Sequence, residues 1–132
     1  LFSELNSDIL IAIGEITAEK EFAPQAAIFN ENEYGDTLFI IVSGEIEISK
    51  GAAGSDKKVL SVLHPTEFFG EMSIFDDKLR SATATAAKES VLLSINKSQF
   101  RELISEYPEI MFEMYKVAIQ RLRNSNVNTV QP

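Results

Sequence analysis

Apolar residues recur along this 132-residue chain first with helical spacing, then in short runs typical of strands, and finally with helical spacing again. A first helix is predicted over residues 7–16, where Asn6 or Ser7 can cap an apolar stripe that consists of Ile9, Leu10, Ile13 and Ile16. A short helix is predicted over residues 97–105. A longer helix is predicted from Pro108, a residue that suits a first helical turn, to about Asn124.

Between these helices the apolar runs are short and are separated by turn residues. Strands are predicted near Phe22 and over residues 27–29, 38–42, 45–49, 59–63, 81–86 and 91–95. Residues 51–56 form the loop of a central hairpin in this interpretation. Regularly spaced short strands indicate a mainly β fold, a β-barrel or jelly roll, with one N-terminal helix and two C-terminal helices.

Composition and charge exclude several classes of function. A length of 132 residues predicts a single domain, and the first residue, Leu1, suggests that residues 1–132 were cut from a longer multidomain protein. Apolar runs such as residues 38–42 are far too short to span a membrane, and no signal peptide is visible. The absence of cysteine fits a cytoplasmic location. The net charge of −8 argues against nucleic acid as a partner of this segment.

Residues 69–83 carry the clearest chemical signal. Gly70 lacks a side chain, so backbone N–H groups there can approach an anion closely. Glu71 has a carboxylate that can accept hydrogen bonds from sugar hydroxyls. Arg80 follows nine residues later, and its planar guanidinium matches two phosphate oxygens. A carboxylate for ribose and a guanidinium for phosphate on one short segment predict a nucleotide pocket.

This segment resembles the phosphate-binding cassette of the cyclic-nucleotide-binding domain family, which includes the catabolite activator protein, regulatory subunits of cyclic-nucleotide-dependent kinases, and cyclic-nucleotide-gated channels. The resemblance rests on Phe69-Gly70-Glu71, on the step to Arg80, and on the small residues Ser81 and Ala82. It extends to the glycine-punctuated stretch over residues 35–48 and to three C-terminal segments, residues 100–104, 107–108 and 121–123.

The resemblance implies a regulatory, non-enzymatic module that binds a 3′,5′-cyclic nucleotide, cAMP in preference to cGMP, and that needs no cofactor and no metal. It places the cyclic phosphate against Arg80 and Ser81, the ribose 2′-hydroxyl against Glu71, and base contacts on the last helix. The implied ligand-binding residues are Ile48, Leu60, Phe69, Gly70, Glu71, Met72, Ser73, Arg80, Ser81, Arg121, Ser125 and Asn126.

Other interpretations of the same residues stay open at this point. Arg80 can form a surface salt bridge with Asp76 or Asp77, and Glu71 can simply stabilise a helix N-terminus. Gly35 and Gly44 are interpreted as turn glycines. Two positions depart from the family pattern: Ser73 replaces a smaller residue, and Thr66-Glu67 stands where a Gly-Asp pair is common.

Two other functions are alternatives to a cyclic-nucleotide-binding module. A cupin enzyme would need several metal ligands in the barrel, and the chain has one histidine, His64. A degenerate module could serve only as a structural or dimerisation unit, or bind another small effector. The last helix has a second apolar stripe, which either widens the core face, covers the ligand or pairs with a second copy to form a homodimer: Phe112, Tyr115, Ile119 and Leu122. No DNA-reading element is seen, so the effector domain is expected outside this chain.

Overall fold

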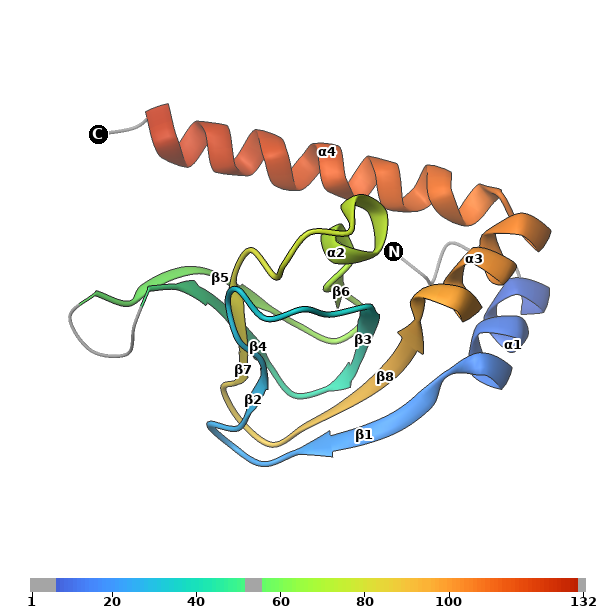
Figure 1. Cartoon of the computed structure of the whole chain (residues 1–132), viewed down its shortest axis with the longest axis horizontal. Coiled ribbons are helices and arrows are strands. Elements are labelled where there is room, and N and C mark those ends of the chain that lie inside the picture. Colours follow the sequence, from blue (N-terminus) through green and yellow to red (C-terminus); the bar gives the residue numbers. More distant parts are fainter. Residues whose placement is uncertain (1–6, 52–55, 131–132) are drawn as a thin grey trace.

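The computed structural model describes residues 7–51 and 56–130, with side chains described as far as Asn124 (Figure 1). Four helices occur in these ranges: α1 (Ser7–Ile16), α2 (Met72–Asp76), α3 (Lys97–Glu106) and α4 (Glu109–Val130). The strands are β1 (Ala18–Phe22), β2 (Ala27–Phe29), β3 (Thr37–Ser43), β4 (Ile46–Lys50), β5 (Lys58–Leu63), β6 (Phe68–Phe69), β7 (Thr83–Ala86) and β8 (Ser90–Asn96).

The strands form two four-stranded antiparallel sheets, with the orders β1-β8-β3-β6 and β2-β7-β4-β5. Helices α1 and α3 lie together at one end of the molecule, and α4 runs across α2 above the barrel (Figure 1). The predicted mainly β fold with one N-terminal helix and C-terminal helices is therefore confirmed. The boundaries of α1 also agree with the predicted helix over residues 7–16.

Strand β3 separates two cores because its side chains alternate between the two faces of a sheet. Leu38 pairs with Ile95 and faces the helices, where both residues join a core with Phe100 and Ile110. The next residue, Phe39, points into the space between the sheets and belongs to the second core. The first core attaches the helices to the barrel, and the second borders the cavity described below.

Two predicted elements differ from the structure by at least two residues at one end. The predicted strand over residues 81–86 begins only at Thr83. Arg80, which precedes this segment, pairs with the turn before β3. Its backbone N–H donates to the carbonyl of Glu33 at 2.8 Å, and its carbonyl accepts from the N–H of Asn32 at 2.8 Å. Helix α4 continues to Val130, beyond the predicted end near Asn124. No helix in the described ranges is both long and apolar enough to cross a lipid bilayer.

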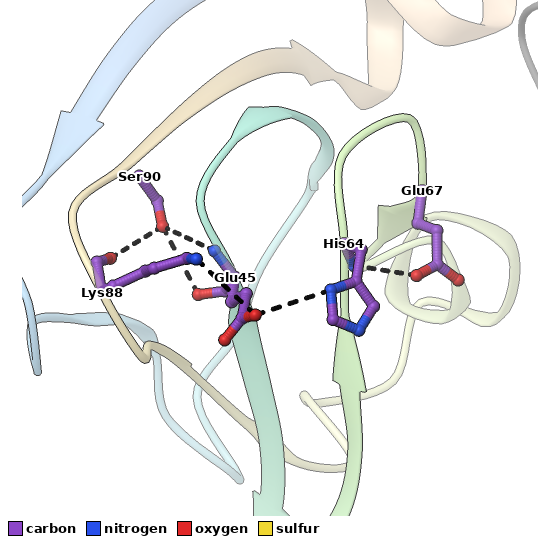
Figure 2. Close-up of polar contacts among 5 residues, drawn as sticks. All are labelled: Glu45, His64, Glu67, Lys88 and Ser90. Carbon is purple, nitrogen blue, oxygen red and sulfur yellow. Dashed lines mark hydrogen bonds and ion pairs between the residues drawn. The ribbon is translucent and has the colours of Figure 1, made fainter.

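Polar side chains tie the turn after β3 to the start of β8 (Figure 2). The N–H of Glu45 donates to the hydroxyl of Ser90 at 3.3 Å, and Gly44 with φ +98° approaches Ser90 so closely that a Cβ would collide with it. The imidazole Nδ1 of His64 lies 3.8 Å from the Glu45 carboxylate, and 57% of its side chain is exposed. The described residues include no group of three or more His, Cys, Asp or Glu arranged to hold a metal ion.

Thr66, in the turn between β5 and β6, has a left-handed backbone with φ +77°. A β-branched side chain rarely adopts this conformation, whereas glycine adopts it readily. The turn is fixed on both sides, because the N–H of Thr66 donates to the carbonyl of Ile41 and the N–H of Ile41 donates to the carbonyl of Glu67. The departure from the family pattern noted at this position therefore puts a threonine where the backbone favours glycine.

Candidate ligand-binding site

A cavity of about 210 Å³ lies between the barrel, the α2 segment and α4. Nine of the twelve predicted site residues line it: Ile48, Phe69, Gly70, Glu71, Met72, Ser73, Arg80, Ser81 and Arg121. Four lining residues were not predicted as site residues: Phe29, Ser61, Leu63 and Ala82. The structure thus brings together residues from several separate stretches of sequence around one space.

Arg80 is held rigidly at the barrel side of this cavity. The residue is 4% exposed, and its guanidinium donates to the carbonyl of Gly70 at 2.9 Å and to the carbonyl of Thr37 at 2.8 Å. Its Cζ atom lies 4.1 Å from the ring centroid of Phe29, which is a cation–π distance. The predicted alternative, a surface salt bridge with Asp76 or Asp77, does not form, because Asp77 pairs with Lys97 and Asp76 accepts from the N–H of Lys78.

Gly35 makes room for this guanidinium. A Cβ at Gly35 would lie 2.5 Å from the Cζ atom of Arg80 and would also collide with its Nε atom. Gly70, with φ +87°, is similarly close: a Cβ there would lie 3.0 Å from an Nη atom of Arg80 and 2.9 Å from the Thr37 carbonyl oxygen. The interpretation of Gly35 as a turn glycine is therefore incomplete, because the arginine requires the missing side chain.

Opposing effects act on the charge of Arg80. Burial lowers the pKa of the Arg80 guanidinium, while the carboxylates of Asp36, Glu71 and Glu33 raise it. An arginine keeps its charge under such conditions because its ordinary pKa lies far above neutral pH. The Nε atom of Arg80 is buried and has no hydrogen-bond partner among the residues that the structure describes. A buried cation with unused donors is a favourable place for an anion.

Glu71 stands at the entrance to α2, yet its side chain makes no capping hydrogen bond to that helix. Its carboxylate instead lies 3.5 Å from an Nη atom of Arg121, which comes from α4. The guanidinium of Arg121 also donates to the carbonyl of Phe68 at 2.6 Å and stacks over the Phe68 ring at 4.7 Å. The residue expected to bind ribose is therefore in direct contact with the long C-terminal helix.

Leu60 does not line the cavity, although the sequence predicted that it would. Ile48 of β4 is paired with Ser61 of β5, so Ser61 and Leu63 share the face of the sheet that borders the cavity. Leu60 directly precedes Ser61, at the point where the register between β4 and β5 shifts; it is 45% exposed and does not line the cavity. The side chains of the last two predicted residues, Ser125 and Asn126, lie outside the described residues.

A barrel cavity with a buried arginine, a carboxylate and a short helix is the architecture of a nucleotide-binding regulatory domain. Comparison with known proteins agrees, because the sequence profile of the cyclic nucleotide-binding domain matches residues 19–107. The chain belongs to the cyclic nucleotide-binding domain family.

Three relatives show how widely this domain is used. A CRP-like cAMP-activated global transcriptional regulator of Mycobacterium tuberculosis is 31% identical over 128 residues, covering 97% of this chain and 57% of that protein. A cyclic nucleotide-gated potassium channel of Rhizobium etli is 36% identical over 126 residues, covering 92% of this chain and 32% of the channel. The crystal structure of Thermus thermophilus catabolite activator protein aligns with a TM-score of 0.87 at 25% identity, covering 97% of this chain and 60% of that one. The chain thus spans about half or less of the curated relatives it matches.

Proposed function

We propose that this domain is a regulatory module that binds a 3′,5′-cyclic nucleotide, with cAMP favoured over cGMP, and that it does not catalyse a reaction. The observation that carries the proposal is the buried Arg80, which is held by two backbone carbonyls at a cavity that Glu71 and Ser81 also line. Membership of the cyclic nucleotide-binding domain family and the cAMP-activated regulator among its relatives support the choice of ligand.

In this proposal the cyclic phosphate docks against Arg80. Each Nη atom of a guanidinium carries two N–H groups, and the carbonyls of Gly70 and Thr37 each take one. The remaining N–H groups are the proposed donors to the phosphate oxygens, since Arg80 lines the cavity. The N–H and hydroxyl of Ser81 and the backbone N–H groups that follow Gly70 complete the phosphate contacts. Local donors in a desolvated site outweigh the screened field of a chain with net charge −8.

The ribose end of the ligand connects the cavity to α4. The carboxylate of Glu71 accepts a hydrogen bond from the 2′-hydroxyl, and this same carboxylate contacts Arg121. A ligand that engages Glu71 therefore changes the environment of an α4 side chain. If the ligand binds one position of α4 better than another, it shifts the population toward that position, and an attached effector reads the shift.

Base preference depends on the residue directly after the cassette arginine. Ser81 has a hydroxyl but lacks the methyl group that restricts the rotamer of threonine. We expect that the change Ser81→Thr moves the preference toward cGMP, because a threonine hydroxyl at this position can reach both the phosphate and the guanine amino group. Titration of both proteins with both nucleotides measures this ratio.

The outer face of α4 supports a homodimer. The stripe facing the barrel includes Ile110 and Met114, which are buried in the first core. Three residues of the second stripe lie outside the core, since Phe112, Tyr115 and Leu122 are 63%, 62% and 58% exposed, whereas Ile119 is partly buried. The spacing of three and four residues along this stripe, with Ile119 between Tyr115 and Leu122, is typical of a helix pair. We propose that a second copy of α4 covers this second stripe.

We also propose that the effector domain lies outside residues 1–132 and that this domain works in the cytoplasm.

A calorimetric and thermal-shift panel with cAMP, cGMP and 5′-AMP tests the proposal. Ligand at a hundred times its dissociation constant adds about 2.7 kcal/mol to the free energy of unfolding. For a domain of this size such a gain raises the melting temperature by on the order of 10 °C. We expect that rise with cAMP, a smaller one with cGMP and little with 5′-AMP. No shift with either cyclic nucleotide at millimolar concentration would leave the alternative, a degenerate module used for dimerisation or another effector.

A further inference from the structure

A groove of about 360 Å³ lies between α1 and α3, at the end of the molecule opposite the β4–β5 hairpin (Figure 1). Its floor is apolar and consists of Ala12 and Ile16 from α1 and Leu103 from α3. Ile11 borders the groove with 60% of its surface exposed. This groove is separate from the cavity around Arg80, and the two share no lining residue.

Both helices place carboxylates along the rims of the groove. Asp8 and Glu15 lie seven residues apart on α1, and Glu102 and Glu106 lie four residues apart on α3. Residues at these separations fall on one face of a helix, so each helix presents its two carboxylates toward the groove. All four residues are exposed. The result is an apolar floor between two acidic rims.

No cation among the described residues forms an ion pair with the carboxylates of these rims. None of the residues that line the groove is Lys, Arg or His, and within residues 7–51 and 56–124 none of the four carboxylates forms an ion pair with one. These carboxylates also affect the hydroxyl of Tyr107, which lines the groove. Burial and the carboxylates of Glu106, Asp8 and Glu109 all raise the pKa of the Tyr107 hydroxyl.

The chain's own undescribed segments do not match this surface. Residues 1–6, 52–55 and 131–132 contain no Lys and no Arg. A complementary occupant needs apolar side chains for the floor and cations for both rims, which is the pattern of an amphipathic helix with a basic flank on each side of its apolar stripe. We propose that the groove between α1 and α3 docks a basic amphipathic helix of a partner protein.

A designed peptide provides the probe. An 18-residue helical peptide of leucine and lysine, with leucine at every third or fourth position, is titrated into the whole chain and followed by fluorescence anisotropy. We expect saturable binding that weakens as salt is added, because the rim contacts are exposed and screened. A peptide with glutamate in place of every lysine should bind at least about tenfold more weakly. Equal binding of the two peptides, or no binding of the lysine peptide, would overturn the proposal.

Matched variants locate the binding surface. The double change Glu102→Lys with Glu106→Lys should weaken binding of the lysine peptide by roughly tenfold or more. The control Glu19→Lys with Glu21→Lys, at exposed positions of β1, alters the net charge equally: each change adds two, so both proteins move from −8 to −4. The control should bind nearly as well as the parent chain. Similar losses in both variants would mean that only net charge matters, and the groove would be excluded.

A second pair of variants tests the apolar floor. Ile11→Asp should weaken binding by roughly tenfold, whereas Leu10→Asp, at a neighbouring residue of α1 that is 41% exposed and does not line the groove, should not. Circular dichroism checks that all variants remain folded. Sedimentation tests the remaining occupant, a second copy of this chain. If Glu102→Lys with Glu106→Lys dissociates an oligomer while the lysine peptide fails to bind the parent chain, the groove is a self-interface and the proposal is wrong.

Discussion

Two arginines from different parts of the molecule meet at one cavity, and they are held in different ways. Arg80 is 4% exposed and is fixed by two barrel carbonyls and by the Phe29 ring. Arg121 extends from α4, its side chain is 32% exposed, and its contacts are with Phe68 and Glu71. We propose that the barrel supplies a preorganised anion site and that the helix supplies a partly exposed contact that can be broken at small cost. The first arrangement suits affinity, and the second suits transmission of a signal.

The largest effect should come from removing the barrel arginine. We expect Arg80→Ala to weaken cAMP binding by about 30-fold to several thousandfold, because loss of a desolvated charge-assisted contact costs roughly 2–5 kcal/mol. The change also leaves the carbonyls of Gly70 and Thr37 without their donors, so a lower melting temperature is expected. Calorimetry and thermal unfolding measure the two effects separately.

Arg123→Ala is the control for this experiment, since it removes the same charge from an exposed position of α4. It should leave both affinity and melting temperature nearly unchanged. If the two variants bound cAMP equally well, the barrel site would not be the phosphate site. Arg80→Lys keeps the charge but loses the planar pair of donors, and we expect an intermediate affinity.

Removing the ribose partner should have the next largest effect. A hydrogen bond to a charged group is worth roughly 1.5–3 kcal/mol, so Glu71→Ala should weaken cAMP binding by about 10- to 100-fold. The 2′-deoxy analogue lacks the hydroxyl and should bind the parent and the variant with similar affinity. If the analogue lost as much affinity as cAMP in the variant, Glu71 would not be the ribose partner.

A change outside the cavity lining can test whether preorganisation matters. Gly35→Ala introduces a Cβ that collides with the Arg80 guanidinium and must displace it from the two carbonyls. We expect cAMP affinity to fall by roughly tenfold, as for a misaligned charge-assisted contact. Gly14→Ala is the matched control, because a Cβ on this α1 residue meets nothing within 4 Å and should stabilise the helix by about 0.5–1 kcal/mol. Normal affinity in Gly35→Ala would show that cAMP binding does not require the hydrogen bonds from Arg80 to the carbonyls of Gly70 and Thr37.

The smallest change in affinity should come from the helix arginine. A partly exposed ion pair such as Arg121–Glu71 contributes up to about 1 kcal/mol, so Arg121→Ala should alter cAMP affinity by at most about fivefold. We expect a clearer effect on α4, whose amide hydrogen exchange should respond less to cAMP in the variant than in the parent chain. A loss of affinity as large as that of Arg80→Ala would mean that the two arginines do not have separate roles.

The fold could be predicted from sequence because its signals are local. Alternating and helical apolar patterns located α1, α3 and most of the strands within a few residues and the start of α4 within one, and the cassette spacing located Arg80 and Glu71 together. The contact between Gly35 and Arg80 could not be predicted, since it joins residues that are close only after folding. The contact between Arg121 and Glu71 could not be predicted for the same reason, because the two residues are far apart in the sequence.

Leu60 illustrates a different limit. Strand β5 lies at the edge of its sheet, and its residues are exposed on both faces as far as Val62. Apolar residues at positions 59, 60 and 62 give no alternation from which the inward face can be identified. Only the pairing of Ile48 with Ser61 shows which face borders the cavity. The register between β4 and β5, rather than the residue types of β5, determines which β5 residues line the cavity.

A crystal structure of the chain with cAMP would test the central claim most directly. The claim is that the guanidinium of Arg80 binds the phosphate and that the carboxylate of Glu71 binds the ribose. We expect a phosphate oxygen at about 2.7–2.9 Å from an Nη atom of Arg80, which still donates to the carbonyls of Gly70 and Thr37. The 2′-hydroxyl should lie at hydrogen-bond distance from the Glu71 carboxylate. A nucleotide bound away from this cavity, or one whose phosphate does not contact Arg80, would contradict the account.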